Sequence, residues 1–373
     1  MKNTDLHINI VSFDIPYPPS YGGVIDVFFK IKALYDKGVR IHLHAFHYGR
    51  KPSAELEKYC YEVFYYPRKA LLNPFLHHIP YIVRSRKSSL LLKNLQKNNY
   101  PVIFEGIHCS YYLNWAELND RIKIVRMHNI EHIYYLHLAK VENNLIKKFY
   151  FSLESKRLRK YLHKLNHATH VAAISPSDHT ILNIKLNNSF YLPVFHPNHE
   201  VTAIEGKGNY VLYHGNLGIG ENNEAALFLV EKVFNNLDIP FIIAGSKASS
   251  HLKKAVRGNK NIQLLNPDTE KIYQLITEAQ INILPTFQDT GIKLKLLNAL
   301  FRGRHCLVNT KMIKDTGLSD LCYIADNESD FKLKVVDLFD KTFTKEMLEQ
   351  RREKLSQRFN NQLSAEILIN QIF

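Results

Sequence analysis

Three stretches decide the fold that the sequence predicts: HINIVSF at His7–Phe13, VIDVFFKIKALY at Val24–Tyr35 and VRIHLHAF at Val39–Phe46. The first run is short and apolar, as in a buried strand. The second has a helical pattern and is closed by Gly38, and the third alternates like a second strand. A strand, a helix and a strand in this order form the unit of a parallel sheet covered by helices. The sequence therefore predicts an α/β fold.

Strand patterns of this kind recur in two series. The first continues at 101–106, 123–127 and 170–174, and the second runs through 210–214, 240–244, 261–265, 281–284 and 305–308. Residues 194–209 have little periodicity and include a proline and two glycines, so we expect a linker there. We predict two doubly wound, Rossmann-like domains, 1–193 and 210–345, that face a central cleft. A helical C-terminal segment, 346–373, is expected to pack back on the first domain.

Charge is distributed unevenly along the chain. The 373 residues carry 49 Lys or Arg and 35 Asp or Glu, a formal net charge of +14. Residues 1–200 hold 27 basic and 15 acidic side chains, against 22 and 20 in residues 201–373. Nucleic-acid binding would explain such an excess, but no helix-turn-helix, zinc-finger or RNA-binding signature occurs. We therefore expect no nucleic acid partner, and an anionic membrane surface that meets the first domain.

Several protein classes are excluded by composition. With 45% apolar residues, the chain is globular rather than disordered. Its four scattered cysteines have the spacing of neither a zinc site nor a disulfide framework, which fits a reducing compartment. No run approaches the ~20 apolar residues of a membrane-spanning helix, and the first residues lack the pattern of a signal peptide. We expect a cytoplasmic protein, peripheral on the inner membrane face.

Two basic stretches with helical spacing, 81–97 and 147–160, are candidates for contact with that membrane. Basic amphipathic helices bind anionic lipid. The open alternative is an ordinary solvated helix face over a stripe of core residues.

A proline-rich loop, PYPPSYGG at Pro16–Gly23, joins the first predicted strand to the first helix. Gly22 and Gly23 would let backbone N–H groups approach a ligand at the positive end of that helix. A purely structural junction is the alternative.

Three motifs in the second half complete a pattern with this loop. They are YHGNL at Tyr213–Leu217, AGS at Ala244–Ser246 and TGIKLKLLNAL at Thr290–Leu300. In order and spacing, over nearly the whole chain, they resemble a GT-B glycosyltransferase of the family 4 type. The resemblance implies an N-terminal domain that holds the acceptor, which we expect near Tyr17, Gly22 and Gly23. It also implies a C-terminal domain that holds a nucleotide-sugar donor, and no metal or separate cofactor.

The segment Thr290–Leu300 departs from the family pattern, which has two glutamates eight positions apart. Those positions are Thr290 and Asn298 here, so neither supplies a negative charge, although both side chains can form hydrogen bonds. An Arg and a Lys that the family carries after the first strand of the second domain are also absent. A diphosphate needs cations and backbone donors, which lysines and glycines near these loops supply. The predicted donor-binding residues are Gly215, Asn216, Lys247, Thr290, Gly291, Lys293, Lys295 and Asn298.

Two histidines follow predicted strands of the first domain, His108 after 101–106 and His128 after 123–127. The carboxyl ends of strands line the ligand crevice of a doubly wound sheet. A neutral imidazole can bond a sugar hydroxyl or stabilise charge at the anomeric centre, and Glu131 is placed to orient His128. We predict catalytic roles for these three residues. Because the chain has 19 histidines, an ordinary structural role is the alternative for either histidine.

The resulting prediction is a hexosyltransferase that moves a sugar from a nucleotide-diphosphate donor to a glycan or lipid-linked acceptor, as in lipopolysaccharide or capsule biosynthesis. Retention of configuration follows from the resemblance alone. His128, Glu131 and His132 lack a further ligand at a recognisable spacing, so we expect no metal. The alternatives are a GT-B sugar-nucleotide epimerase, a catalytically inactive GT-B scaffold and, in a different class, a basic nucleic-acid-binding protein.

Overall fold

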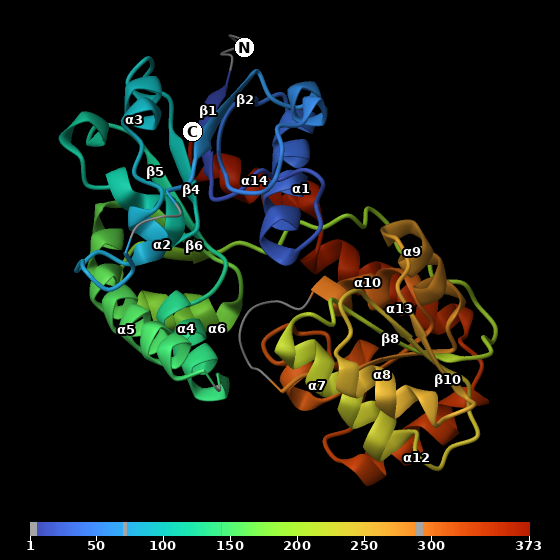
Figure 1. Cartoon of the computed structure of the whole chain (residues 1–373). Helices are drawn as coiled ribbons and strands as arrows, with labels where there is room; N and C mark the ends of the chain where they lie inside the picture. The colour runs from blue at the N-terminus through green and yellow to red at the C-terminus, as the bar shows by residue number, and fades with distance from the viewer. Residues whose placement is uncertain (1–5, 70–72, 143, 288–293) are drawn as a thin grey trace. The chain divides into compact units, whose positions relative to one another are not determined.

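The computed structural model describes the chain except for residues 1–5, 70–72, 143 and 288–293 (Figure 1). The chain divides into two compact units. The first runs to Pro197 and includes Phe359–Phe373, and the second is Asn198–Arg358. The expected linker, 194–209, is therefore divided between the units after Pro197, and the expected C-terminal segment, 346–373, is divided after Arg358.

A parallel sheet with strand order β3-β2-β1-β4-β5-β6-β7 forms the centre of the first unit. Successive residues are buried along β1, β2, β4 and β5, so both faces of the sheet are covered, as parallel sheets require. The strands are β1 (His7–Ser12), β2 (Arg40–His47), β3 (Glu62–Pro67), β4 (Val102–Glu105), β5 (Lys123–Met127), β6 (His170–Ala173) and β7 (Ser189–Tyr191).

The helices of the first unit follow its strands and end with the last helix of the chain. They are α1 (Gly22–Asp36), α2 (Tyr81–Arg84), α3 (Ser89–Leu95), α4 (Glu131–Val141), α5 (Leu145–Tyr161), α6 (Pro176–Asn183) and α14 (Asn361–Asn370). The stretch 81–97, with its single helical pattern, is broken into α2 and α3 at Ser85–Ser88, and the Ser88 hydroxyl caps α3 by accepting from the Leu91 N–H.

The end of the chain belongs to the first unit because it packs on α1. Ala365 and Leu368 of α14 are buried in the same hydrophobic core as β1 and α1. The side chain of Asn361 bonds both the N–H and the carbonyl of His196, at 3.1 and 2.7 Å. The segment before Pro197 is thereby fixed to α14.

The second unit is built on a parallel sheet with order β10-β9-β8-β11-β12-β13. Its strands are β8 (Val211–His214), β9 (Phe241–Ala244), β10 (Ile262–Leu265), β11 (Ile281–Leu284), β12 (His305–Val308) and β13 (Tyr323–Ile324). Its helices are α7 (Gly220–Phe228), α8 (Ser250–Arg257), α9 (Thr269–Glu278), α10 (Leu294–Arg302), α11 (Thr310–Ile313), α12 (Glu328–Phe339) and α13 (Lys345–Arg358).

In both sheets the strand order reverses beside the first strand, between β1 and β4 and between β8 and β11. The predicted doubly wound α/β class is confirmed. Three edge strands, β3, β7 and β13, were not expected. β13 is two residues long, and all residues of β7 and most of β3 are less than fully buried, so their sequences lack a clear apolar run.

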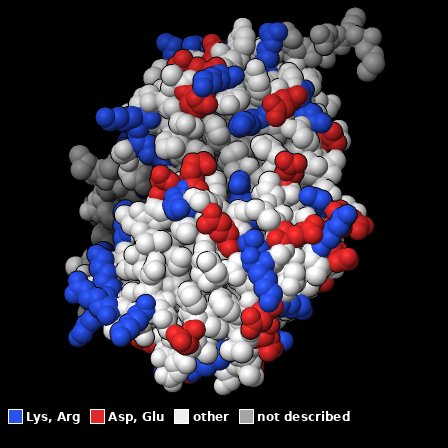
Figure 2. Space-filling model, turned by 90° about the vertical axis from the view of Figure 1, so that its right-hand side faces the viewer, with Lys and Arg blue, Asp and Glu red and all other residues white. Residues whose placement is uncertain are grey.

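The surface carries both signs of charge. On the face drawn in Figure 2, Lys and Arg side chains are interspersed with Asp and Glu rather than gathered into one basic stripe. Within the described residues, no helix is both long enough and apolar enough to span a bilayer.

Two loops of the second unit approach each other at a pair of glycines. Gly215 follows β8 and Gly245 follows β9, which pairs with β8. A Cβ on Gly245 would lie 1.9 Å from the carbonyl oxygen of Gly215. Since that oxygen belongs to the backbone, it can move only if the loop moves, and the loops after β8 and β9 depend on glycine at this position.

We expect Gly245→Ala to destabilise the protein by about 1–3 kcal/mol, because the new methyl group forces the two loops apart. Gly258→Ala is the matched control, since a Cβ there meets nothing within 4 Å and should change stability by less than about 1 kcal/mol. Urea unfolding of both variants measures the difference. Equal stabilities would contradict the proposed close approach.

Candidate functional site

The carboxyl ends of β1, β4 and β5 bring the predicted residues of the first unit together. These strands are neighbours at the point where the strand order reverses, which is where doubly wound folds bind ligands. His108 follows β4 and His128 follows β5. The ring of Phe13, just after β1, has its centroid 5.5 Å from that of His108 and 5.4 Å from that of His128. Both imidazoles therefore contact one aromatic ring.

Gly23 is needed for this arrangement. A Cβ on Gly23, in the first turn of α1, would lie 2.6 Å from Cζ of Phe13. Gly23 thus has a packing role. Gly22 is exposed, and Tyr17 is half-buried with its ring 5.4 Å from that of Phe28. An acceptor-binding role for Tyr17, Gly22 and Gly23 stays a prediction.

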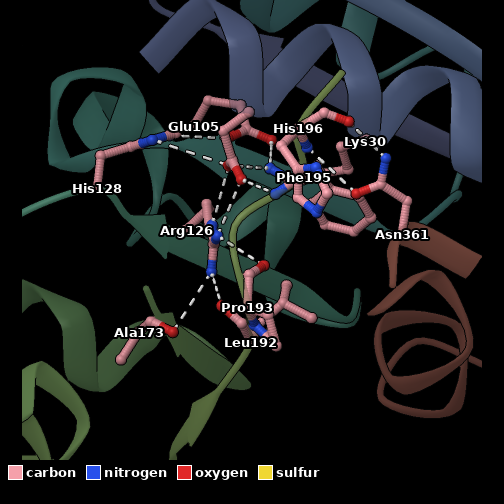
Figure 3. Close-up of polar contacts among 11 residues, drawn as sticks. Lys30, Glu105, Arg126, His128, Ala173, Leu192, Pro193, Phe195, His196 and Asn361 are labelled. Carbon is pink, nitrogen blue, oxygen red and sulfur yellow. Dashed lines mark hydrogen bonds and ion pairs between the residues drawn. The ribbon is translucent and has the colours of Figure 1, made fainter. Parts of the chain in front are cut away.

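His128 is held between two buried carboxylates, and Figure 3 shows it pointing toward Glu105. Nε2 of His128 lies 3.1 Å from Oε2 of Glu105, the last residue of β4. Nδ1 lies 3.8 Å from Oδ2 of Asp26 in α1. Carboxylates beside both ring nitrogens fix the orientation of the ring, which a histidine needs if it is to donate a hydrogen bond or carry a proton.

Lys30 and Arg126 balance the charges of the two carboxylates. Nζ of Lys30 donates to Asp26 at 3.1 Å and to Glu105 at 2.6 Å. Nε and Nη2 of Arg126 donate to the two carboxylate oxygens of Asp26 at 3.1 and 3.0 Å. All four side chains are at most 1% exposed. Two cations and two anions therefore pair away from water.

The cations keep both carboxylates ionised. Burial by itself would raise the pKa of Asp26, but Arg126 and Lys30 lower it below its ordinary value. Burial likewise opposes ionisation of Glu105, and Lys30 and His128 lower its pKa. Since each carboxylate has its cations within hydrogen-bond distance, the cost of removing these charges from water is offset within the cluster.

The same cluster holds the segment that leaves the sheet. Nη1 of Arg126 donates to the carbonyl of Leu192 at 2.6 Å, and Nη2 donates to that of Pro193 at 3.2 Å. Oδ1 of Asp26 accepts from the N–H of Phe195 at 2.8 Å. Helix α1, strand β5 and residues 192–195 are therefore joined through one ion pair, as Figure 3 shows for Arg126 and its backbone partners.

Glu131, which was expected to orient His128, does not contact it. Glu131 is buried at the start of α4 and bonds the side chain of Asn129, and burial raises the pKa of its carboxyl to about 7. Glu105 and Asp26 occupy the orienting position instead. They are distant from His128 in sequence, so only the order of the strands would have identified them.

His108 is a neutral imidazole at the same strand ends. Burial, followed by the nearby Arg86, lowers the pKa of His108 well below its ordinary value. Its buried Nδ1 has no hydrogen-bond partner in the described part of the chain and lies against Gly106, where a Cβ would be only 2.5 Å away. Glycine at 106 thus leaves room for the ring. A role of His108 in sugar binding stays a prediction.

The loops after β8 and β9 carry predicted donor residues of the second unit. Gly215 directly follows β8, and Oδ1 of Asn216 accepts from the N–H of Gly218 at 3.1 Å. Lys247 follows β9 with a φ of 60°, and its side chain packs against Gly218, where a Cβ would lie 3.0 Å from Cβ of Lys247. Both loops therefore meet at Gly218, at the carboxyl edge of the sheet.

Lys295, in the first turn of α10, is linked to the same loops. Its Nζ donates to Oδ1 of Asn222 at 3.0 Å, and Nδ2 of Asn222 donates to the carbonyl of Asn216 at 3.0 Å. His214, at the end of β8, is buried, and burial followed by Lys295 lowers its pKa to about 3. The structure thus brings Gly215, Asn216 and Lys295 together around Asn222.

Asn298 lies one turn further along α10. Its Oδ1 accepts from Nδ2 of Asn198 at 3.0 Å. The remaining predicted donor residues, Thr290, Gly291 and Lys293, lie outside the described residues.

One carboxylate that the sequence analysis missed lies near the point where the strand order of the second sheet reverses, between β8 and β11. Glu221, in the first turn of α7, accepts a hydrogen bond from the hydroxyl of Thr286, a buried residue that follows β11. Neither residue belongs to a motif. Their signal in the sequence was that they follow the two strands between which the order reverses, Thr286 directly after β11 and Glu221 at the start of the helix after β8.

The ionised cluster of the first unit also has the spacing of a metal site. Ligand atoms of Asp26, Glu105 and His128 lie within 4.8 Å of one another. The two carboxylates already bind Lys30 and Arg126, whose positive charges cancel the negative charge that a divalent cation requires. These residues therefore do not fit a metal ion.

Comparison with known proteins gives a family match to part of the second unit and a fold for the whole chain. Residues 208–341 match the family model described as "Glycosyl transferases group 1". An uncharacterized 44.6 kDa protein in the cps region of Klebsiella pneumoniae is 28% identical over 324 residues, which cover 82% of this chain and 83% of that protein.

Solved structures similar to the whole chain have the GT-B fold. TarM matches with a TM-score of 0.70 at 12% identity, over 99% of both chains. A point mutant of Staphylococcus aureus TarM, solved with fondaparinux, α-GlcNAc-glycerol and UDP, gives a TM-score of 0.69 at 12% identity, again over 99% of both chains. Anabaena HepE with UDP and glucose gives 0.67 at 10% identity, over 97% of this chain and 98% of that one.

Asp26→Asn should destabilise the protein by about 3–5 kcal/mol at pH 7, because it leaves the buried Arg126 without its carboxylate and Lys30 with only that of Glu105. The folded-state pKa of Asp26 lies below the ordinary value of 3.8. Its stabilisation is therefore complete above about pH 4 and is lost as the pH falls through the folded-state value. The difference between wild type and variant in urea unfolding should accordingly shrink in acid.

Glu366→Gln is the matched control, since Glu366 pairs with Lys37 at the surface and is 51% exposed. Exposed ion pairs contribute less than about 1 kcal/mol. If both variants were equally stable at pH 7, the buried cluster would not have the structural role described above.

Proposed function

We propose, from the premise that the chain is a GT-B glycosyltransferase of the group 1 type, that it transfers a sugar from a nucleoside-diphosphate sugar to a glycan or lipid-linked acceptor. One observation carries the proposal. The residues suited to a diphosphate gather where the strand order reverses in the second unit, within the part that matches the family model. The solved structures of TarM and HepE contain UDP, which supports a nucleotide donor.

The donor site would use cations and amides where the family uses carboxylates. Lys295 comes from the first turn of α10 and Lys247 from the loop after β9, at the same edge of the sheet, and both ammonium groups are suited to phosphate oxygens. Asn298 would bond ribose hydroxyls. Thr290, Gly291 and Lys293 belong to the same proposed site on the strength of the sequence alone.

In the proposed reaction, the bond between the anomeric carbon and the diphosphate oxygen breaks and a bond to an acceptor oxygen forms. The leaving nucleoside diphosphate gains negative charge, which the lysines stabilise. As the new bond forms, the acceptor hydroxyl gives its proton to an oxygen of the leaving diphosphate. His128, held by Glu105, would bond the sugar or stabilise charge at the anomeric centre, with His108 as a neutral neighbour.

The finer features are part of the same proposal. The transferred sugar would be a hexose, the configuration would be retained and no metal would take part, since Lys30 and Arg126 already bind the carboxylates of the first unit. Similarity to a protein of a cps region favours a capsule or related polysaccharide as the product. The enzyme would work in the cytoplasm, peripheral on the inner membrane face.

Lys295→Ala should weaken nucleoside-diphosphate binding by about tenfold or more, because a hydrogen bond to a charged group contributes roughly 1.5–3 kcal/mol. A thermal-shift screen with UDP, GDP and CMP conjugates selects the ligand, since a compound that binds only the folded state raises the melting temperature. Calorimetry then compares Lys295→Ala with Lys332→Ala, a half-exposed lysine paired with Glu328. No shift with any nucleotide, or equal affinities in the two variants, would contradict the donor assignment.

His128→Ala should lower the rate of transfer by about 10²-fold or more while leaving nucleotide affinity unchanged, since the proposed role of His128 concerns the reacting sugar. Release of nucleoside diphosphate with and without acceptor is the measurement. Exposed His251, in α8 of the second unit, provides the control substitution, His251→Ala. An epimerase would form product from donor alone, and an inactive scaffold would bind nucleotide without turnover.

A further inference from the structure

Large apolar side chains are exposed where α4 and α5 meet. Leu145 is 79% exposed, Ile146 72% and Phe149 62%, and Val141, at the end of α4, is 67% exposed. Figure 1 shows α4 and α5 side by side, and the two helices pack closely on each other. We call these four residues the hairpin tip. Soluble proteins seldom expose so many neighbouring apolar side chains unless the surface binds something.

A neighbouring loop extends this apolar surface. The ring of Phe75 lies 6.0 Å from that of Phe149, and Leu76 is 77% exposed. The loop is fastened to α5, because Nη2 of Arg157 donates to the carbonyl of Phe75 at 2.9 Å. The exposed side chains thus come from two segments distant in sequence and fixed to each other.

The tip is held in a defined helical conformation. Oδ1 of Asn144 accepts from the N–H groups of Ile146 and Lys147, each at 3.1 Å, and so caps α5. Residues 144–149 are all exposed, so the first turn of α5 faces solvent on all sides. Because these N–H groups are already satisfied, this turn can enter an apolar environment without leaving them unpaired.

Basic side chains lie among the apolar ones. Lys140, Lys147 and Lys148 are exposed, and no ion pair of the described residues includes them. Residues 140–160 contain seven Lys or Arg and two Glu, and one of the two, Glu154, is buried and paired with Arg157. The surface around the tip is therefore strongly positive.

We propose that the hairpin tip inserts into the headgroup region of an anionic membrane. Apolar residues that enter the interface, with lysines beside them that meet lipid phosphates, are the two features of helices that lie on such membranes. A second copy of the chain would bring the same lysines together and be repelled. A nucleic acid would leave the apolar side chains without a partner.

The proposal depends on the proposed function only for its purpose, which is to bring the enzyme to an acceptor carried by a lipid. Membrane binding itself concerns α4 and α5 and is separate from the donor residues of the second unit. The membrane-binding proposal and the proposed function can therefore be contradicted independently of each other.

Sedimentation with vesicles tests the proposal. The full chain should sediment with vesicles of phosphatidylglycerol and phosphatidylcholine in equal parts, and far less with phosphatidylcholine alone. Leu145→Gln/Ile146→Gln/Phe149→Gln should weaken binding to the anionic vesicles by about tenfold or more. Lys147→Gln/Lys148→Gln should weaken it by about 30-fold, at roughly 1 kcal/mol for each lysine.

Matched controls come from the second unit. Lys253→Gln/Lys254→Gln alters two adjacent exposed lysines of α8, and Leu333→Gln/Val336→Gln removes two apolar side chains of α12 that are 64% and 51% exposed. Neither should change vesicle binding. Thermal unfolding and nucleotide binding, measured on the same samples, should match wild type in every variant and show that each one is folded.

Three results would overturn the proposal. The first is that wild type does not bind anionic vesicles, and the second is that the tip variants bind them as well as wild type does. The third is that wild type forms a dimer and binds no vesicles, and that the tip variants are monomers. In a further readout, Phe149→Trp should give a blue-shifted emission with anionic vesicles, whereas Leu333→Trp should not. An unshifted emission from Phe149→Trp would also contradict insertion.

Discussion

The ion pair between Asp26 and Arg126 is the interaction on which the first unit depends. It joins α1 to β5, and its hydrogen bonds to the carbonyls of Leu192 and Pro193 and to the N–H of Phe195 fix the segment that leaves the sheet. Through Lys30, the same carboxylate is connected to Glu105, which orients His128. A charge network in the core therefore determines both how the unit is built and where its candidate catalytic histidine points.

The proposed donor site of the second unit would bind a diphosphate sugar without the two glutamates of the family pattern. The close approach of Gly215 and Gly245 brings the loops after β8 and β9 together, and Asn222 connects Asn216 to Lys295. Cations and amides surround this edge, and Glu221 supplies a carboxylate at a position that the family pattern does not mark. The proposed donor site therefore relies on positive charge and side-chain amides.

The fold was predicted well from the sequence where the pattern of apolar residues follows the burial of the strands and helices. The runs at β1, α1 and β2 are continuous and apolar because both faces of the sheet are covered, whereas β13 is too short and β3 too exposed to be recognised. Glu105 and Asp26 were missed because a charged residue in a strand or helix is usually exposed, and only the fold shows that both are buried and paired. Glu131 was chosen because it is close to His128 in sequence, although strand order decides which side chains meet.

Hydrogen exchange of backbone amides, with and without the nucleotide selected by thermal shift, tests the central claim most directly. The account predicts slower exchange in residues 215–223 and 245–249 and in the first turn of α10, which carry Gly215, Asn216, Lys247 and Lys295. The interior of the second sheet should be unchanged because it is already buried. Slower exchange confined to the first unit, or none in these loops at saturating nucleotide, would contradict the claim that the donor binds where the strand order of the second unit reverses.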